Sequence, residues 1–222
     1  SGLRRRKDGS LVDAEIFGVP VMLDDQQIGV LAMYNDITER VKTEQHLKHL
    51  ATHDPLTMLP NRSLFYEHLD QALHRARRNK SRLAVFFLDL DGFKSVNDLL
   101  GHAQGDLLLQ EVASRFNEAL RSSDIVARLG GDEFAFVCEN LSTPGDAAII
   151  AEKLLVSLSR KIQMAGQEMA ISGSIGISLF PEDGDEARDL LRYADAAMYR
   201  VKDQGKQHFQ FFSWNGRPKE MG

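Results

Sequence analysis

Two short acidic segments contain the side chains best suited to binding a hard metal ion. In the first, Asp89 and Asp91 end an otherwise apolar run that begins at residue 83. Successive side chains of a strand point to opposite faces, so these two carboxylates project together. In the second, Gly130-Gly131 permits a tight turn with positive φ, and Asp132 and Glu133 follow at its mouth. Such carboxylates can bridge a divalent cation to phosphate oxygens, although each segment alone also fits a solvated strand end or an ordinary glycine hairpin.

Between these segments lies a polar stretch whose groups match the hydrogen-bonding edge of guanine. It reads Asn97-Asp98-Leu99-Leu100-Gly101-His102-Ala103-Gln104-Gly105-Asp106. An Asp carboxylate can accept two hydrogen bonds from adjacent donors, which suits the N1–H and 2-amino groups of guanine. An Asn amide can donate and accept together, which suits the rest of that edge. The alternative is helix capping, with Gly101 ending one helix and Asp106 stabilising the start of the next.

Bulk composition excludes several classes of function. The chain of 222 residues carries 27 Lys and Arg against 32 Asp and Glu, a net charge of −5, so it has no basic excess for nucleic-acid binding. Its single cysteine, Cys138, excludes an intrachain disulfide and is expected to be a small buried side chain. No stretch approaches the ~18 apolar residues of a membrane span. We expect a cytoplasmic protein, and the first residues, Ser1-Gly2, indicate a fragment of a longer parent that could itself be membrane-anchored.

The chain divides into a strand-rich N-terminal segment, a polar helix and a longer mixed region. Residues 11–23 and 28–37 read as a hairpin that needs a packing partner, because a lone hairpin is marginal in water. Residues 39–53 read as a polar helix with a thin apolar stripe, which fits either a solvated connector or a parallel helix that pairs two protomers. Further helices are expected at 61–80, 93–100, 104–120, 143–159 and 186–204, and strands at 83–91, 124–129, 133–139, 161–165, 168–179 and 209–212. The expected fold class is α+β, with a mainly antiparallel sheet against helices.

Five motifs in order resemble the GGDEF family of diguanylate cyclases, which condense two GTP into cyclic di-GMP and pyrophosphate. They are Asp54-Pro55-Leu56-Thr57-Met58-Leu59-Pro60-Asn61-Arg62, Asp89-Leu90-Asp91-Gly92-Phe93-Lys94, Asn97 to Asp106, Arg128 to Phe134, and Ala194-Asp195-Ala196-Ala197-Met198-Tyr199. The resemblance covers about residues 50–212. It implies a central, mostly antiparallel five-stranded sheet flanked by helices, similar to the palm of nucleotide polymerases and to class III nucleotide cyclases.

The resemblance also implies roles for individual residues. Asp89 and Asp132, with the backbone carbonyl of Leu90, would bind Mg²⁺ or Mn²⁺, and Asp132 and Glu133 would form the catalytic set. The substrate GTP would be bound by Asn97 and Asp106 at the guanine and by His102, Lys94, Lys202 and Lys206 elsewhere, with Arg128 as a further candidate near the phosphates. Two positions depart from the family pattern. Lys206 replaces a common arginine and lacks its bidentate fork, and Met58 replaces a frequent glycine in a turn.

A shorter motif precedes the glycine turn and points to regulation. Arg121-Ser122-Ser123-Asp124 matches the RxxD inhibitory site of many family members. By this resemblance Arg121 and Asp124 would bind the product, cyclic di-GMP, with the Arg pairing to phosphate or guanine acceptors. Feedback inhibition by product would follow. The alternative is a helix C-terminal Arg followed by an Asp that opens a strand.

The segments on either side resemble parts of other signalling domains. Residues 1–38 contain Arg6-Lys7-Asp8-Gly9-Ser10 and lead into Asp36-Ile37-Thr38-Glu39-Arg40, a pattern that resembles the end of a PAS sensor domain. We expect residues 39–53 to be a signalling linker helix, 54–213 the cyclase domain and 214–222 a tail. The sequence Phe209-Gln210-Phe211-Phe212-Ser213 resembles the junction into a downstream phosphodiesterase domain of the EAL type.

The product contains two nucleotides, whereas one site holds one GTP. The simplest arrangement is therefore a homodimer in which two sites face each other, so that proximity replaces an encounter between substrates. The main alternative is a non-catalytic domain that binds GTP or cyclic di-GMP and regulates an adjacent EAL domain. The complete acidic set favours catalysis. A purely structural protein would need neither the metal-binding nor the guanine-binding groups.

Overall fold

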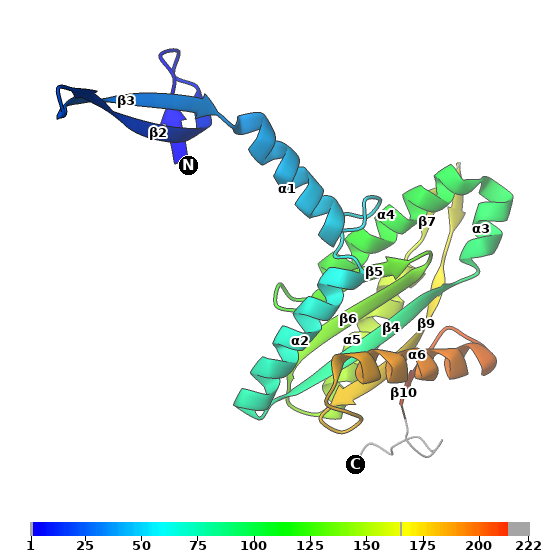
Figure 1. Cartoon of the computed structure of the whole chain (residues 1–222). Helices are drawn as coiled ribbons and strands as arrows, with labels where there is room; N and C mark the ends of the chain where they lie inside the picture. Colours follow the sequence, from blue (N-terminus) through cyan, green and yellow to red (C-terminus); the bar gives the residue numbers. More distant parts are fainter. Residues whose placement is uncertain (1, 165, 213–222) are drawn as a thin grey trace. The chain divides into compact units, whose positions relative to one another are not determined.

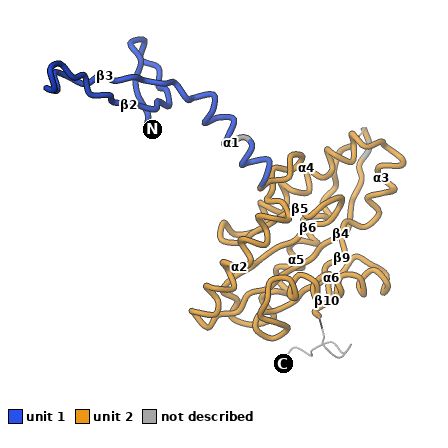
Figure 2. The backbone as a smooth tube through the Cα atoms, viewed as in Figure 1, with its two compact units in different colours: residues 1–51 blue, residues 52–222 orange. Residues whose placement is uncertain are grey.

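The computed structural model describes residues 2–164 and 166–212, so Ser213 and the expected tail at 214–222 lie outside the described residues. The chain forms two compact units, Ser1–Ala51 and Thr52–Gly222 (Figure 2). No helix of the described residues is long and apolar enough to cross a membrane.

The first unit is a three-stranded antiparallel sheet followed by a helix. Its strands are β1 (Gly2–Arg5), β2 (Leu11–Leu23) and β3 (Gln26–Asp36), in that order, and α1 spans Thr38–Thr52. The sequence predicts the two long strands and the helix but not β1, because β1 is short, arginine-rich and lacks an apolar alternation. Asp24 and Asp25 both adopt positive φ, as the two-residue turn between β2 and β3 requires. Thr38 begins α1, and its Oγ1 accepts a hydrogen bond from the Asp13 N–H at 3.1 Å.

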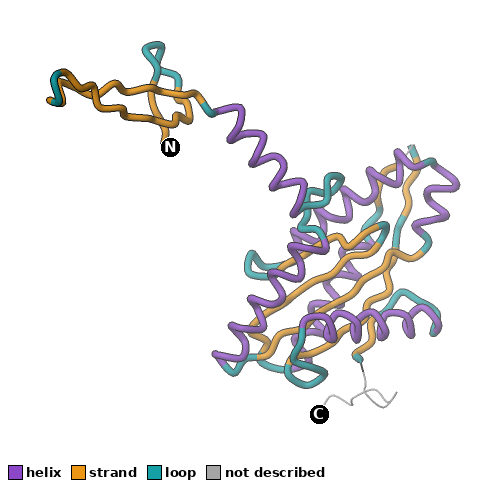
Figure 3. The backbone as a smooth tube through the Cα atoms, in the orientation of Figure 1, coloured by secondary structure: helices purple, strands orange, loops and turns teal. Residues whose placement is uncertain are grey.

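The second unit is a five-stranded sheet with helices on both faces (Figures 1 and 3). The strand order is β10-β9-β4-β6-β5, and all neighbours are antiparallel except β10 and β9. The predicted α+β fold with a mostly antiparallel sheet is therefore confirmed. The elements are α2 (Arg62–Asn79), β4 (Arg82–Asp91), α3 (Phe93–Leu100), α4 (His102–Ala119), β5 (Ile125–Gly130), β6 (Glu133–Leu141), α5 (Pro144–Ser159), β7 (Ile162–Met164), β8 (Gln167–Met169), β9 (Ser172–Phe180), α6 (Ala187–Asp203) and β10 (Phe209–Phe211).

One predicted strand is wrong. Residues 168–179 form parts of two strands, β8 and β9, rather than a single one. β8 pairs only with β7 in a small two-stranded ribbon, whereas β9 pairs with β4 and β10 in the main sheet. The strands have no turn residue such as glycine or proline between them, so local sequence does not reveal that β8 ends and that its pairing partner differs from that of β9.

Two buried clusters cover the two faces of the main sheet. Alternate residues of β4 divide between them: Ala84, Phe86, Leu88 and Leu90 face one cluster, and Leu83, Val85 and Phe87 face the other. The first cluster is completed by α4 and α5, and the second by α2 and α6. Odd-numbered positions of β4 therefore point toward α2 and α6, which determines where the acids at the end of this strand lie.

Close backbone contact fixes α6 against the sheet. A Cβ on Gly176 of β9 would lie 1.9 Å from the Ala194 carbonyl oxygen and 2.2 Å from the Met198 nitrogen, both in α6. Only glycine permits this approach. On the other face, buried Arg115 of α4 donates to the carbonyls of Ser157 and Arg160 at 3.1 and 2.6 Å, which ties α4 to the end of α5.

The segment before α2 is a tight turn closed by Asp54. Asp54 Oδ1 accepts hydrogen bonds from the backbone N–H and the hydroxyl of Thr57 at 2.9 and 2.7 Å. Met58, at the position where the family often has glycine, has φ 61° and a 57% exposed side chain. A left-handed conformation costs a residue with a Cβ about 1–2 kcal/mol. The backbone conformation at position 58 therefore favours glycine, whereas the chain has methionine there.

Replacing Met58 by glycine should stabilise the second unit. Relief of the left-handed strain outweighs the extra unfolded-state entropy of glycine, so Met58→Gly should raise the free energy of unfolding by about 0.5–1 kcal/mol. Chemical denaturation monitored by circular dichroism measures the change. Met58→Ala is the control, because it removes the exposed side chain but retains the strain, and it should give no gain. A glycine variant no more stable than the alanine variant would contradict this account.

Candidate active site

Three acidic residues meet where β4 ends beside the turn between β5 and β6. Asp89 of β4 pairs in register with Glu133, the first residue of β6, so both side chains lie on the face covered by α2 and α6. The Leu90 N–H donates to the Asp132 carbonyl at 3.2 Å, which ties the strand end to the turn. Residues far apart in sequence, Asp89, Asp132 and Glu133, are thus placed at one end of the sheet as the sequence predicts.

Asp89 is a buried carboxylate with a cationic partner. It is 9% exposed, and Lys202 Nζ of α6 lies 2.7 Å from its Oδ2. Burial raises the pKa of Asp89, and the charges of Asp132 and Asp91 raise it further, while Lys202 opposes the shift. The structure therefore places Lys202 against a carboxylate, a contact that the sequence does not predict for it.

Glu133 has a similar environment on the same face. Burial raises the pKa of Glu133, with smaller contributions from Asp195 and Asp89, and Arg62 lowers it. Arg62 Nη2 lies 3.6 Å from Glu133 Oε2. Burial also raises the pKa of Asp195, again opposed by Arg62 and then by Lys202. Sequence reasoning assigned no role to Arg62 or Asp195, although both belong to motifs that it identified.

Asp91, the other acid of the β4 end, differs from Asp89 in its partners. Its carboxylate accepts hydrogen bonds from the Ser172 and Ser174 hydroxyls of β9 at 3.0 and 2.8 Å. It also accepts one from the Gln207 backbone N–H at 3.3 Å. Asp91 therefore fixes the loop after α6, in which Lys206 and Gln207 both have positive φ. The sequence places both acids on one face but gives no signal for this division, because the serines are 81 and 83 positions away.

Arg128 supports the glycine turn through hydrogen bonds to its backbone. Its Nε and Nη2 donate to the Gly131 carbonyl at 3.0 and 2.7 Å, and its Nη1 donates to Asp54 Oδ1 at 2.9 Å. Both glycines of the turn have positive φ, 148° at Gly130 and 54° at Gly131, which is a conformation that favours glycine. Burial alone would raise the pKa of Asp54, but hydrogen bonds from Thr57 and Arg128 outweigh it and lower the pKa below its usual value. The guanidinium considered for phosphate contact is thus engaged in holding the turn.

The residues expected to read guanine lie on α3 and α4. The Asn97 side-chain oxygen is buried and has no hydrogen-bond partner within the described ranges. Gly105 lies directly against it, since a Cβ there would be 1.8 Å from Asn97 Oδ1. Asp106 and His102 are exposed on the first turns of α4, and Lys94 is exposed on α3. A buried acceptor without a donor is costly, so Asn97 is suited to receive one from a ligand.

The oxygen donors at the end of β4 suit a hard divalent cation, but they are too few to complete its coordination. In the portion of the chain that the structure describes, no group of three or more His, Cys, Asp or Glu side chains is arranged to hold a metal ion. The expected set comprises two carboxylates, Asp89 and Asp132, and the Leu90 carbonyl. Oxygen donors of this kind suit Mg²⁺ or Mn²⁺, and the Lys202 ammonium beside Asp89 marks a position that attracts positive charge. Further oxygen ligands would have to come from a nucleotide or from water.

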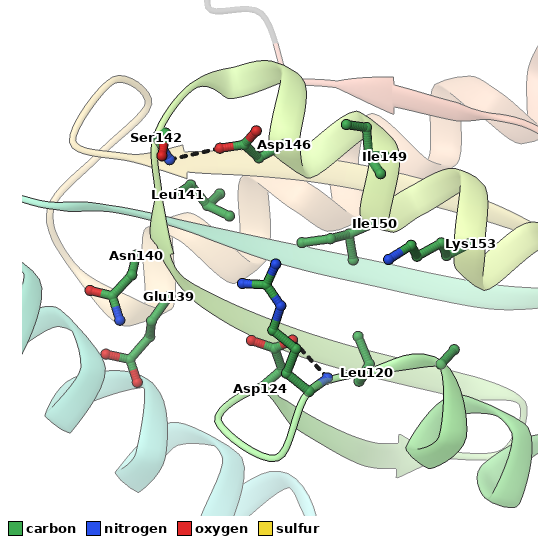
Figure 4. Close-up of a pocket in the computed structure, with 12 residues that line it drawn as sticks. Leu120, Asp124, Glu139, Asn140, Leu141, Ser142, Asp146, Ile149, Ile150 and Lys153 are labelled. Atoms are coloured by element: carbon green, nitrogen blue, oxygen red, sulfur yellow. Dashed lines mark hydrogen bonds between the residues drawn. The ribbon is translucent and has the colours of Figure 1, made fainter.

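Arg121 and Asp124 lie in a separate pocket at the opposite end of β5 (Figure 4). β5 runs from this pocket to the glycine turn, a distance of about 20 Å. The Arg121 N–H donates to Asp124 Oδ2 at 3.1 Å, and burial raises the pKa of Asp124. The other lining residues come from the end of α4, the end of β6 and α5: Ala119, Leu120, Glu139, Asn140, Leu141, Ser142, Asp146, Ile149, Ile150 and Lys153. Nearby Cys138 is free and buried, and burial raises the pKa of its thiol, so it acts as an apolar core residue.

The chain belongs to the GGDEF family, because a family model described as "Diguanylate cyclase, GGDEF domain" matches residues 51–208. It is 49% identical over 186 residues to the bifunctional diguanylate cyclase/cyclic di-GMP phosphodiesterase MucR of Pseudomonas aeruginosa, covering 83% of this chain and 27% of MucR. It is 46% identical over 161 residues to the diguanylate cyclase TpbB of the same organism, covering 72% of this chain and 37% of TpbB. The chain thus spans only about a quarter to a third of these curated relatives.

Solved structures show the same fold. The GGDEF domain of TpbB from Pseudomonas aeruginosa superposes with a TM-score of 0.72 at 44% identity, covering 73% of this chain and 95% of that one. The GGDEF domain of DgcB from Caulobacter crescentus, solved in complex with cyclic di-GMP, gives a TM-score of 0.68 at 31% identity, covering 72% and 95%.

Removing the Arg128 side chain should destabilise the glycine turn. In Arg128→Met, the Asp54 carboxylate, 18% exposed, loses its cationic partner but keeps the hydrogen bonds from Thr57, and the Gly131 carbonyl loses two donors. The free energy of unfolding at pH 7 should fall by about 3 kcal/mol. Because the folded pKa of Asp54 is lowered, its stabilising contribution is present above the unfolded value near 3.8 and is lost as pH falls through the folded value.

The deficit should therefore shrink in acid, which denaturant titrations at pH 7 and at pH 3 would measure. Arg192→Met is the control, because Arg192 pairs with Asp189 on the exposed surface of α6 and should cost under about 1 kcal/mol. Equal losses for the two variants would show that Arg128 does not support the turn.

Proposed function

We propose that the second unit is a diguanylate cyclase that condenses two GTP into cyclic di-GMP and pyrophosphate. The observation that carries the proposal is the hydrogen bond from the Leu90 N–H to the Asp132 carbonyl, which places Asp132 beside buried Asp89. The two carboxylates and the adjacent Lys202 provide charges of both signs, as a metal–triphosphate complex needs. Membership of the GGDEF family and the relative TpbB, named as a diguanylate cyclase, support the same reaction.

In this proposal Asp89, Asp132 and the Leu90 carbonyl hold Mg²⁺ or Mn²⁺. When bound, the ion neutralises triphosphate charge and lowers the pKa of the attacking 3′-hydroxyl. Glu133 belongs to the catalytic set, and its raised pKa brings it closer to the range in which a carboxylate accepts a proton. Arg62 orients Glu133 through their ion pair, and Asp91 positions the loop that carries Lys206.

The substrate contacts divide between base and phosphates. Asn97 offers its unpartnered oxygen to the guanine amino edge, and Asp106 accepts from the same edge. Lys202 and Lys206 contact the phosphates as point charges, and Lys94 and His102 lie on α3 and α4 beside the guanine-reading residues. Adenine would leave at least one of these base-reading groups without a hydrogen-bond partner, so the pocket favours guanine nucleotides.

Condensation requires two such sites. We propose that two protomers face each other, each presenting one GTP. The predicted linker at residues 39–53, of which 39–52 lie in α1, would transmit geometry from an upstream PAS-like segment at residues 1–38 to the cyclase domain beginning near residue 54. Control of the approach of two half-sites then controls the rate without any change in the chemistry at either. A signalling role of this kind suits a chain that spans only part of its multidomain relatives.

Product inhibition is assigned to the pocket of Arg121 and Asp124. An arginine and a carboxylate together match the phosphate and guanine groups of cyclic di-GMP. This pocket and the proposed catalytic acids are separated by the length of β5, so bound product would act at a distance rather than by occupying the substrate site.

A second candidate is a regulatory domain that binds GTP or cyclic di-GMP without turning it over, beside an EAL phosphodiesterase domain. This candidate is favoured by the relative MucR, whose name gives both cyclase and phosphodiesterase activities to one protein. The intact acids Asp89, Asp132 and Glu133 favour the cyclase, since binding alone has less need of all three.

The reaction can be tested directly. The purified chain with GTP and Mg²⁺ should form cyclic di-GMP, separated from GTP by ion-exchange chromatography, and Glu133→Gln should lower the rate by about a hundredfold or more. Glu118→Gln, on the exposed face of α4, is the control and should retain activity. Absence of cyclic di-GMP from protein that gel filtration shows to be dimeric would favour the regulatory alternative.

The Lys202–Asp89 ion pair predicts an order of metal and nucleotide binding. Lys202 occupies the position of positive charge at Asp89, so without nucleotide Mn²⁺ should bind weakly. Lys202→Met should bind Mn²⁺ alone about tenfold more tightly but GTP less tightly, because the ammonium no longer competes with the metal or contacts phosphate. Electron paramagnetic resonance of free Mn²⁺ measures the first effect. Lys206→Met is the control for net charge and should leave Mn²⁺ affinity unchanged; an equal gain in both variants would refute the prediction.

A further inference from the structure

One face of α6 carries further polar and aromatic groups beside the proposed active site. Asp195, Tyr199 and Lys202 are spaced four and three positions apart along this helix. Side chains at these spacings lie on one face of a helix. Lys202 shows where that face points, because its Nζ lies 2.7 Å from Asp89 Oδ2 at the end of β4. Tyr199 and Asp195 therefore lie on the side of α6 that meets the acids, about one and two turns before Lys202.

The charges around Asp195 agree with this position. Burial raises the pKa of Asp195, and the charges of Arg62 and then Lys202 oppose the shift. The charge of Asp195 in turn helps to raise the pKa of Glu133, whose Oε2 lies 3.6 Å from Arg62 Nη2. Asp195 thus lies near the first residue of α2 and near the proposed catalytic acid, although the residue as a whole is exposed.

The residues proposed for the first GTP, the one bound by the same protomer, extend from the acids in the other direction. Asn97 lies in α3, which begins two residues after β4 ends, and Lys206 lies in the loop whose backbone donates to Asp91. A nucleotide with its base at α3 and its phosphates at Lys202 and Lys206 does not extend toward Asp195, which lies on the α2 side of the acids. This is the side from which a second nucleotide can approach.

We propose that Asp195 and Tyr199 bind the ribose of the second GTP, the one that the partner protomer presents. The inference rests on the proposed cyclase reaction and assigns to it two residues beyond those of the first nucleotide. Condensation requires the 3′-hydroxyl of the second GTP to reach the α-phosphate of the first, so the second ribose must lie beside the acids and Lys202. Asp195 accepts a hydrogen bond from the neighbouring 2′-hydroxyl, and the Tyr199 ring packs against the sugar.

The chemistry of both side chains suits a ribose. Acidic side chains bind ribose hydroxyls in dinucleotide-binding folds, and a hydrogen bond to a charged acceptor is roughly twice as strong as one between neutral groups. The cations Arg62 and Lys202 offset the repulsion between Asp195 and the nucleotide phosphates. Tyr199 is 64% exposed, and within the described part of the second unit it is the one aromatic residue among the exposed large apolar side chains. Its ring is therefore available to a ligand.

A substrate that lacks the 2′-hydroxyl tests the role of Asp195. Rates of cyclic dinucleotide formation are measured with GTP and with 2′-deoxy-GTP, each with Mg²⁺, for the wild type and Asp195→Ala. The wild type should prefer GTP. Asp195→Ala should lower this preference about tenfold by slowing the reaction with GTP, while the rate with 2′-deoxy-GTP should change less than about threefold. Asp195→Asn retains an acceptor oxygen and should keep the rate with GTP within about threefold of the wild type.

Two further comparisons complete the design. Asp189→Ala removes the same charge elsewhere on α6, where Asp189 pairs with Arg192, and it should keep the wild-type preference between the two nucleotides. Tyr199→Ala should slow the reaction about tenfold with both nucleotides, because packing on the sugar does not depend on its 2′-hydroxyl. Tyr199→Phe retains the ring and should stay within about threefold of the wild type.

The outcomes separate this proposal from the cyclase reaction itself. If Asp195→Ala slows both nucleotides by the same factor, or if Asp195→Asn is as slow as Asp195→Ala, Asp195 does not bind the 2′-hydroxyl and the proposal fails. A wild type that uses both nucleotides equally well, or a Tyr199→Ala variant with wild-type rates, also overturns it. All of these results leave the cyclase reaction standing. A wild type that forms no cyclic di-GMP from GTP would instead refute the proposed function together with this inference.

Discussion

Desolvation of the Asp89 carboxylate is the constraint on which the rest of the site depends. Seven apolar or aromatic residues of β4 accompany this acid in the interior, and the fold then has to supply positive charge to it. Lys202 supplies it from α6, and α6 can approach closely enough because Gly176 leaves room for its backbone. The same attraction is available to a metal ion, so the energetic cost of burying Asp89 is also what makes the site able to bind a cation.

Helix α2 connects the two candidate sites in a way that neither motif suggests. Arg62 at its first residue contacts Glu133, and Arg75 near its end contacts Glu139, so one helix is paired to one strand, β6, at two points. Both pairs of positions are about 20 Å apart along their elements, which allows the helix and strand to run together over that length. The helix packs against Ala135 and Val137 between these points. The proposed catalytic acid and the wall of the proposed product pocket therefore share one rigid support.

Local pattern predicted most of the fold and part of the site. Alternation along β4 placed Asp89 and Asp91 on one face, and the glycine turn placed Asp132 and Glu133 at its mouth, as observed. Pairing between distant segments was not predictable in this way. The serine partners of Asp91, the Arg62–Glu133 contact and the Arg75–Glu139 pair each join elements brought together only by the sheet order. The break between β8 and β9 was not predicted for the same reason, because the residues of a strand do not show which strand it pairs with.

The two acids at the end of β4 differ in the donors that neighbouring elements supply to them. Asp89 and Asp91 have the same side-chain type, the same strand and the same face, and each lies opposite a serine of β9, Asp89 opposite Ser174 and Asp91 opposite Ser172. Both serine hydroxyls and the Gln207 backbone N–H nevertheless donate to Asp91. Its oxygens accept from three donors of the protein, whereas the partner of Asp89 among the described residues is one lysine ammonium. A carboxylate whose oxygens accept hydrogen bonds from fixed donors has a structural role. A carboxylate paired with the ammonium of a long lysine side chain can exchange that partner for another cation. The donors that reach each carboxylate, rather than the acid itself, determine which of the two is available for chemistry.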